Sequence, residues 1–220
     1  MYILGISGSP RGAQSASRRL LERALDGAKE SGAEVELIDI GKLKLSFCIA
    51  CENCHINGRC PLRDDIESIR EQLRSADGII FASPNYFNSV TAQLKTVFDR
   101  LSHEIHCQLF LGKYACSVAT AGSPEYEVTL DFMNDILSRL GCTVIGGTGC
   151  APAFPGAMDK AEEESLALGR DLATAISEKR VIPEQEAIHE TMHNRFKQLM
   201  TFSKDHWPYE YEYWQKQGWL

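Results

Sequence analysis

Four cysteines lie close together between positions 48 and 60, and they are the residues of this sequence best suited to chemistry. Their spacing is C-x2-C-x2-C-x5-C, and Pro61 follows directly. The four are Cys48, Cys51, Cys54 and Cys60. A cubane iron–sulfur cluster binds one thiolate at each of its four irons. Three closely spaced cysteines can bind three of these irons, and a fourth cysteine slightly later in the chain can bind the last. The spacing therefore favours a 4Fe–4S cluster.

Two other interpretations of these cysteines remain open. Structural zinc sites usually place cysteine pairs on separate loops, and three cysteines at successive two-residue gaps do not divide into such pairs. Reduced cysteines without a metal, or a redox pair, are the third interpretation. Among the remaining cysteines, Cys116 and Cys142 fall in predicted strands as small buried hydrophobic residues, and Cys107 and Cys150 are expected to be structural.

A turn rich in glycine and serine, residues 7–17, follows the first apolar run of the chain. Free N–H groups at a helix start can face an anion, and hydroxyl and guanidinium groups add donors. The candidate phosphate-binding residues are Ser9, Arg11, Ser15 and Ser17. The turn matches neither a dinucleotide fingerprint, nor a Walker A loop, nor a nucleophile elbow. Its alternative role is to cap the following helix.

Two further loops carry groups suited to a flat heterocycle with polar edges. Residues 83–89 read Ser-Pro-Asn-Tyr-Phe-Asn-Ser, and residues 120–124 read Thr-Ala-Gly-Ser-Pro. The first loop supplies aromatic rings and amides, and the second supplies backbone donors. Simple packing is the alternative role of Tyr86 and Phe87.

Residues 189–193 read His-Glu-Thr-Met-His and match the zinc-peptidase motif H-E-x-x-H. On a helix both imidazoles would share one face, with Glu190 as the general base. No third ligand stands out, so a peptidase is only a remote alternative. We expect this histidine pair, and also His103 and His106, to be exposed or to face an interface.

Alternating strands and helices must position these loops. Apolar runs predict strands at 2–7, 34–40, 78–82, 113–120 and 142–147, and helical periodicity predicts helices at 18–31, 64–75, 92–101, 126–140 and 160–178. The alternation predicts an α/β fold, in which a parallel sheet has helices on both faces. Ligands of such sheets bind beyond the carboxyl ends of the strands, where the three loops above would meet.

Two units are expected along the chain. Residues 1–180 would form the α/β domain, with the cysteine-rich loop at 41–61. Residues 181–220 would form a C-terminal extension, with a helix at 184–202 and a tail dense in tryptophan and tyrosine. The tail either packs on the domain's own surface or forms a subunit interface.

Composition and charge narrow the function classes. The chain has 220 residues and a formal net charge of -7, which disfavours nucleic acid or an anionic membrane as the main partner. No targeting segment or membrane span is evident, so we expect a cytoplasmic protein whose thiols stay reduced.

Several short sequences in the three loops occur together and in one order. They are Gly8-Ser9-Pro10-Arg11, Ser83-Pro84-Asn85-Tyr86-Phe87, Gln93-Leu94-Lys95, Phe98-Asp99-Arg100 and Ala121-Gly122-Ser123. Over roughly residues 2–150 they resemble the NADPH-dependent FMN reductase family. The resemblance implies a flavodoxin-like fold, with strand order 2-1-3-4-5, and non-covalently bound FMN. It implies that the phosphate is held by Ser9, Arg11, Ser15 and Ser17, one side of the ring by Pro84, Asn85, Tyr86 and Phe87, and another by Ala121, Gly122 and Ser123.

The cysteine loop narrows this resemblance to one group within the family. It follows the second strand, with Asp64-Asp65-Ile66 behind it and Tyr213-Trp214 in the tail, and in this setting it looks like the iron–sulfur flavoproteins of anaerobic microbes. That resemblance implies a homodimer or homotetramer in which cluster and flavin come close across a subunit contact.

The expected function is electron transfer through FMN and a 4Fe–4S cluster, from ferredoxin or NAD(P)H to a small-molecule acceptor. FMN handles two electrons and the cluster one at a time, so no side-chain acid or base is required. A carrier fed by ferredoxin is slightly favoured, because plain hydride transfer needs no cluster. The alternatives are an NAD(P)H-dependent FMN or quinone reductase, whose cysteine site holds zinc or nothing, and a zinc-stabilised FMN-binding regulator.

Overall fold

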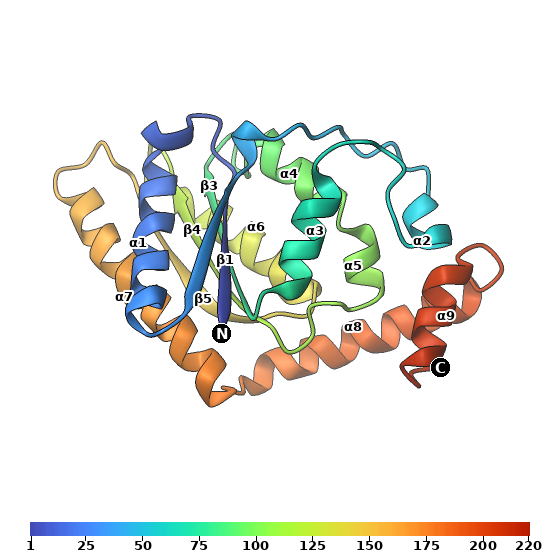
Figure 1. Ribbon diagram of the computed structural model, residues 1–220. Helices are drawn as coiled ribbons and strands as arrows, with labels where there is room; N and C mark the ends of the chain where they lie inside the picture. Colours follow the sequence, from blue (N-terminus) through green and yellow to red (C-terminus); the bar gives the residue numbers. More distant parts are fainter.

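Five parallel strands form a single sheet at the centre of the molecule. The computed structural model describes all residues from 1 to 220. The strands are β1 (Tyr2–Ser7), β2 (Glu34–Asp39), β3 (Gly78–Pro84), β4 (Tyr114–Thr120) and β5 (Thr143–Cys150). Their order is β2-β1-β3-β4-β5, with every neighbouring pair parallel (Figure 1). The predicted α/β class and strand order 2-1-3-4-5 are therefore confirmed.

Helices cover both faces of the sheet and continue beyond it. They are η1 (Gly12–Gln14), α1 (Ala16–Glu30), η2 (Ile40–Lys42), α2 (Asn53–Asn57), α3 (Ile66–Ser75), α4 (Ala92–Asp99), α5 (Ser102–His106), α6 (Tyr126–Arg139), α7 (Ala157–Glu178), α8 (Pro183–Phe202) and α9 (Pro208–Lys216). Helices α1 and α7 cover one face, and α3, α4 and α6 cover the other (Figure 1). None of the helices combines the length and the hydrophobicity needed to cross a lipid bilayer.

Each strand of a parallel sheet is buried on both faces, which explains the continuous apolar runs in the sequence. In β1, Leu4 and Ile6 pack into the core under α3, α4 and α6, whereas Ile3 packs into the core under α1 and α7. Helices α1 and α7 approach each other through glycine. A Cβ added at Gly169 would lie 1.8 Å from the carbonyl oxygen of Ala24, so only glycine permits this contact.

Three short or irregular elements differ from the predicted ranges. Helix α2 lies inside the loop predicted for residues 41–61, and α5 directly follows α4. Helices of five residues offer too few positions for a periodic pattern to show. Strand β5 continues to Cys150, three residues beyond the predicted end at 147. The prediction stopped short because glycine has a low strand propensity, and the last residues of β5 are rich in glycine.

The C-terminal extension packs on its own chain. Helix α8 runs from the far end of α7 beneath α6, and α9 then lies beside α2 (Figure 1). Trp214 of α9 is fully buried, and its Nε1 donates a hydrogen bond to the carbonyl of His106 at 3.0 Å. Of the two expectations for the aromatic tail, packing on the domain is the one observed within this chain. The division at residue 180 stays a prediction.

The histidine pairs do not lie on open surface. In α8, His189 Nε2 lies 3.0 Å from the carbonyl oxygen of Cys142, and the ring of His193 packs on Trp214 with 4.8 Å between centroids. Glu190 is exposed. The expectation of an exposed or interface-facing pair is wrong for His103, which is buried because α9 covers α5.

Candidate functional site

A cavity of about 340 Å³ opens beyond the carboxyl ends of β1, β3 and β4. This is the switch point of the strand order, where open α/β sheets bind their ligands. The residues that line it are Ser9, Arg11, Gln14, Ser15, Ala16, Pro84, Asn85, Tyr86, Thr120, Ala121, Gly122, Pro152 and Ala153. The three loops singled out in the sequence therefore meet in one place, and we call this the sheet-edge cavity.

One end of the sheet-edge cavity is suited to an anion. Ser15 caps α1 by accepting a hydrogen bond from the backbone N–H of Arg18 at 3.2 Å. Ser9 accepts from the backbone N–H of Arg11 at 3.2 Å, while its own N–H has no protein acceptor. The Arg11 guanidinium has no carboxylate partner. An unpaired cation and an open N–H beside a helix start are the groups that a phosphate needs.

The other end of the cavity is shaped by the loops after β3 and β4. Asn85 is fixed at both ends, because its N–H donates to the carbonyl of Thr120 at 2.7 Å and its Nδ2 donates to the carbonyl of Glu125 at 3.0 Å. Tyr86 lines the wall and is partly exposed. The backbone N–H groups of Gly122 and Ser123 have no protein acceptor. These open donors fit the polar edge of a heterocycle.

Three predicted ligand residues do not line the sheet-edge cavity. Ser17 is buried and shares a hydrogen bond of 3.0 Å with the Oγ of Ser15. Phe87 is fully exposed, with a left-handed φ of 51°. The Ser123 hydroxyl donates a hydrogen bond to Oε2 of Glu125 at 2.5 Å. Sequence reasoning missed Pro152 and Ala153, because the predicted fifth strand ended too early for its following loop to be considered.

The four clustered cysteines line a second cavity of about 220 Å³, which we call the thiol cavity. It is enclosed by the cysteine loop and by the segment between α4 and α5. Its lining residues are Cys48, Ile49, Ala50, Cys51, Glu52, Cys54, His55, Cys60, Pro61, Leu62, Asp99, Arg100 and Ser102. All four thiols are free, so the convergence does not come from disulfides.

The backbone between the cysteines is held in an unfavourable conformation. Ala50 and Glu52 have φ values of 49° and 60°, in the left-handed region that non-glycine residues rarely adopt. Each such residue costs on the order of 1 kcal/mol or more, and such strain clusters at ligand sites. These two reversals turn the chain so that Cys48, Cys51 and Cys54 face one cavity.

A buried ion pair anchors both ends of the cysteine loop. Arg100 binds Asp64 through two hydrogen bonds, Nη1 to Oδ2 at 2.7 Å and Nη2 to Oδ1 at 3.0 Å. The same guanidinium donates to the carbonyl of Ser46 at 2.7 Å and to the Sγ of Cys60 at 3.2 Å. Its Nε is buried without a protein acceptor. A buried cation beside a cysteine sulfur complements the negative charge of a thiolate-bound cluster, so the donor set fits an anionic metal cluster.

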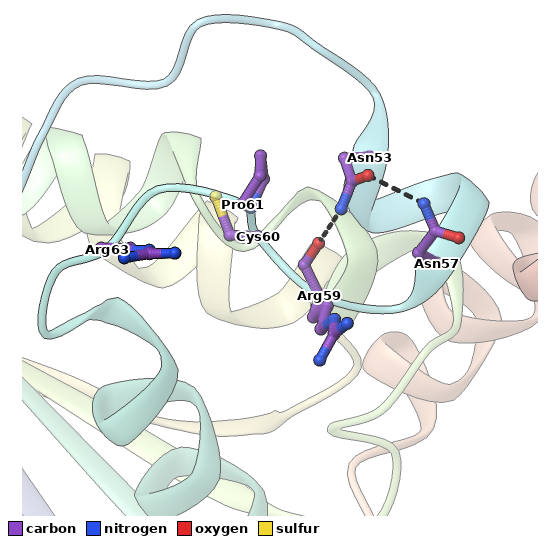
Figure 2. A pocket seen from close by; sticks show the side chains of 6 residues that line it. All are labelled: Asn53, Asn57, Arg59, Cys60, Pro61 and Arg63. Carbon is purple, nitrogen blue, oxygen red and sulfur yellow. Dashed lines mark hydrogen bonds between the residues drawn. The ribbon is translucent and has the colours of Figure 1, made fainter.

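Cys60 is also reached from the outside of the loop, where a hollow of about 810 Å³ is lined by Asn53, Asn57, Arg59, Cys60, Pro61 and Arg63. Figure 2 shows how the turn after α2 is closed: Asn57 Nδ2 donates to Asn53 Oδ1 at 2.8 Å, and Asn53 Nδ2 donates to the carbonyl of Arg59 at 2.7 Å. Arg59 and Arg63 are exposed. The charged side chains that line this hollow are therefore both positive, although the chain as a whole carries a negative net charge.

A flavodoxin-like sheet, a cavity with open hydrogen-bond donors at its switch point and a separate set of four thiols define the class of flavodoxin-like redox proteins. The sequence profile of NADPH-dependent FMN reductases matches residues 1–154. An iron-sulfur flavoprotein of Archaeoglobus fulgidus is 33% identical over an alignment of 228 positions, gaps included, which covers 100% of each chain. The chain belongs to the NADPH-dependent FMN reductase family, and within it to the iron–sulfur flavoproteins. It is therefore an oxidoreductase.

Two further similarities agree with this assignment. An iron-sulfur flavoprotein of Methanocaldococcus jannaschii is 43% identical over 100 residues, which cover 46% of this chain and 51% of that relative. Among solved structures, a flavone reductase superposes with a TM-score of 0.64 at 23% identity, over 80% of this chain and 63% of its own. The structural likeness shows the shared fold.

The ion pair below the thiol cavity should make stability depend on pH. Burial alone would raise the pKa of Asp64, but hydrogen bonds from Arg100 and the backbone lower it to about 2. Because this pKa is lower in the folded chain than in the unfolded one, the stabilisation is complete above about pH 4 and is lost as the pH falls toward 2. Asp64→Asn should lower the free energy of unfolding by about 2–3 kcal/mol at pH 7.

Urea unfolding of cofactor-free protein at pH 7, 4 and 3 measures this effect. The difference between wild type and Asp64→Asn should shrink as the pH falls. Asp135→Asn is the matched control, because Asp135 forms an exposed ion pair with Arg139 and should change stability by less than about 1 kcal/mol. A difference that stays constant from pH 7 to pH 3 would contradict the assignment.

Proposed function

We propose that this chain binds FMN in the sheet-edge cavity and a 4Fe–4S cluster in the thiol cavity, and that it carries electrons between a reduced donor and a small acceptor. The observation that carries the proposal is that four free thiols line one cavity while a separate cavity at the switch point offers unpaired anion donors. When bound, FMN supplies two-electron chemistry and the cluster supplies one-electron chemistry.

The residues of the sheet-edge cavity would bind and orient the flavin. Ser9, Arg11 and Ser15 supply the donors for its phosphate, and Ser17 would act by holding the hydroxyl of Ser15 in place. Asn85, whose side chain is fixed by backbone hydrogen bonds, supports the loop that lies against the ring. Phe87 and Ser123 would reach the flavin only after a change of the loops that carry them.

The residues of the thiol cavity would hold the cluster with Cys48, Cys51, Cys54 and Cys60. Four thiolates concentrate negative charge, and Arg100 places a permanent cation within 3.2 Å of one of them. The guanidinium would also favour the reduced, more negative state of the cluster. Zinc on the same thiols is the alternative.

An oligomer would bring the two cavities together. No residue lines both of them within one chain. Large apolar side chains stand exposed near each, with Phe47 and Ile49 on the cysteine loop and Phe87 beside the sheet-edge cavity. Contiguous exposed apolar residues mark interaction surfaces. A homodimer or homotetramer that pairs the cysteine loop of one chain with the sheet-edge cavity of another is therefore part of the proposal.

Two observations bear on the identity of the electron donor. The family's reductase name supports an NAD(P)H-type donor, whereas a cluster beside an exposed basic hollow supports a one-electron protein donor such as ferredoxin. We favour ferredoxin, because hydride transfer from NAD(P)H to a flavin needs no cluster. The protein would act in the cytoplasm, where its thiols stay reduced.

Arg11→Met should weaken FMN binding by about tenfold or more, because a charge-assisted hydrogen bond to the phosphate is lost. Riboflavin, which lacks the phosphate, should bind both proteins alike. Fluorescence titration of flavin-free protein measures both affinities. Arg23→Met, on the exposed side of α1, is the control and should bind FMN as wild type does. Equal losses for FMN and riboflavin would place the phosphate elsewhere.

Cys54→Ser should abolish the cluster and spare the flavin, because the two cavities share no residue. Protein prepared without oxygen is analysed for iron, acid-labile sulfide, zinc and FMN. Wild type should contain acid-labile sulfide and at least as much iron, and Cys116→Ala, in the core of β4, should keep both. Zinc without iron in the wild type would support the zinc alternative, and protein without metal or flavin would refute the proposal.

Steady-state assays with NADPH, NADH and reduced ferredoxin separate the two versions of the function. Reduced ferredoxin should support reduction of a small acceptor by wild type, and Cys54→Ser should lose this activity because electrons can no longer enter through the cluster. Activity with NADPH alone, retained in Cys54→Ser, would instead identify a plain FMN or quinone reductase.

A further inference from the structure

Three histidines converge on one buried carboxylate beside the thiol cavity. Glu210 of α9 is fully buried. Its Oε1 lies 2.7 Å from the Nδ1 of His55 and 2.9 Å from the Nδ1 of His103, and its Oε2 lies 3.0 Å from the Nδ1 of His106. These residues come from α2, α5 and α9. The same ring nitrogen of all three imidazoles thus points at one carboxyl group.

The charge of this group is not balanced by any fixed cation. The only ionisable partners of Glu210 are the three imidazoles, with no lysine or arginine among them. A buried carboxylate with no lysine or arginine beside it depends on these imidazoles, or on a bound cation, for its counter-charge. The four thiols next to His55 would add negative charge. A divalent cation would neutralise this region.

The spacing of the donor atoms suits a metal ion. Adjacent ligands on an ion with bonds of about 2.1 Å are separated by about 3.0–3.4 Å, depending on geometry. The Nδ1 of His106, 3.0 Å from Oε2, already lies at this separation, whereas the Nδ1 of His55, 2.7 Å from Oε1, is at hydrogen-bond distance, so an ion would take the place of the bridging proton. The ligand atoms of His55, His106 and Glu210 all lie within 4.8 Å of one another. His103 and Cys107, whose Sγ lies 3.6 Å from His103 Nδ1, form a separate set with Glu210.

We propose that His55, His106 and Glu210 form a second metal site, distinct from the four clustered thiols, with His103 as a hydrogen-bond partner of the carboxylate. Imidazole with one carboxylate is a donor set for divalent transition ions such as Zn²⁺ or Fe²⁺, whereas Mg²⁺ and Ca²⁺ prefer oxygen ligands alone. The proposal does not rest on the proposed electron-transfer function, because none of the four clustered thiols is a ligand of this site, although His55 also lines the thiol cavity.

Aromatic side chains hold the imidazoles in place and limit access of water. The ring of Trp207 lies 4.7 Å from that of His55 and 5.1 Å from that of His106, measured between centroids. Tyr209 packs against His103 with 5.5 Å between centroids. Such outer contacts orient metal ligands and tune their affinity. An ion here would tie the C-terminal helix α9 to α2, the helix that carries Cys54.

Metal analysis of the full chain with its cofactors tests the proposal. Protein prepared without oxygen is equilibrated with micromolar Zn²⁺, desalted, and analysed for zinc, iron and acid-labile sulfide. We expect zinc, together with any iron in excess of sulfide, to total one ion per chain. Zinc-edge X-ray absorption should show nitrogen and oxygen ligands at about 2.0–2.1 Å with imidazole scattering.

Matched variants connect the ion to these residues. Glu210→Gln and His106→Asn should retain at least tenfold less of the ion, with cluster iron and sulfide still present. Glu212→Gln, exposed on the same helix, and His206→Asn, exposed before it, should retain the ion fully.

Three results would overturn the proposal. The first is less than about a tenth of an ion per chain, and the second is full retention by Glu210→Gln. The third is a sulfur shell at about 2.3 Å, which would place zinc on the cysteines. The absorption measurement needs only wild-type protein, so it decides the question even if the Glu210→Gln chain does not fold.

Discussion

The cysteine loop depends on one buried guanidinium. Arg100, at the end of α4, binds the carbonyl of Ser46 before the first clustered cysteine, the carboxylate of Asp64 after the last, and the sulfur of Cys60 between them. A loop that bends through left-handed residues has little regular structure of its own to stabilise it. The rigid α/β domain supplies the missing constraint, because α4 presents this side chain from a fixed position.

The central sheet and the sheet-edge cavity were largely predictable from the sequence, for a physical reason. Strands buried on both faces must be apolar throughout, so β1, β3 and β4 stand out, and parallel strands bring their following loops to one edge. The ends of the strands and the short helices were harder to predict. Glycines 146, 147 and 149 concealed the end of β5, and five residues are too few to reveal α2 or α5 by periodicity.

Contacts between distant parts of the chain could not be predicted in this way. Glu210 meets His55 across 155 positions, and no spacing rule relates residues so far apart. The sequence instead drew attention to the H-E-x-x-H match in α8. Its two imidazoles contact the carbonyl group of Cys142 and the tryptophans of the tail. The motif that predicts a metal site is therefore separate from the cluster of imidazoles around Glu210.

The contact between α1 and α7 limits how this protein can vary. Gly27 and Gly169 let the two backbones touch, and a side chain at either position would collide with a carbonyl group of the other helix. This contact fixes the position of α1 on α7, and Ser15 is the N-cap residue of α1. Variation in the loops after β3 and β4 would leave this contact intact, but at these two glycines even one methyl group would push α1 away from α7 and displace Ser15 in the sheet-edge cavity.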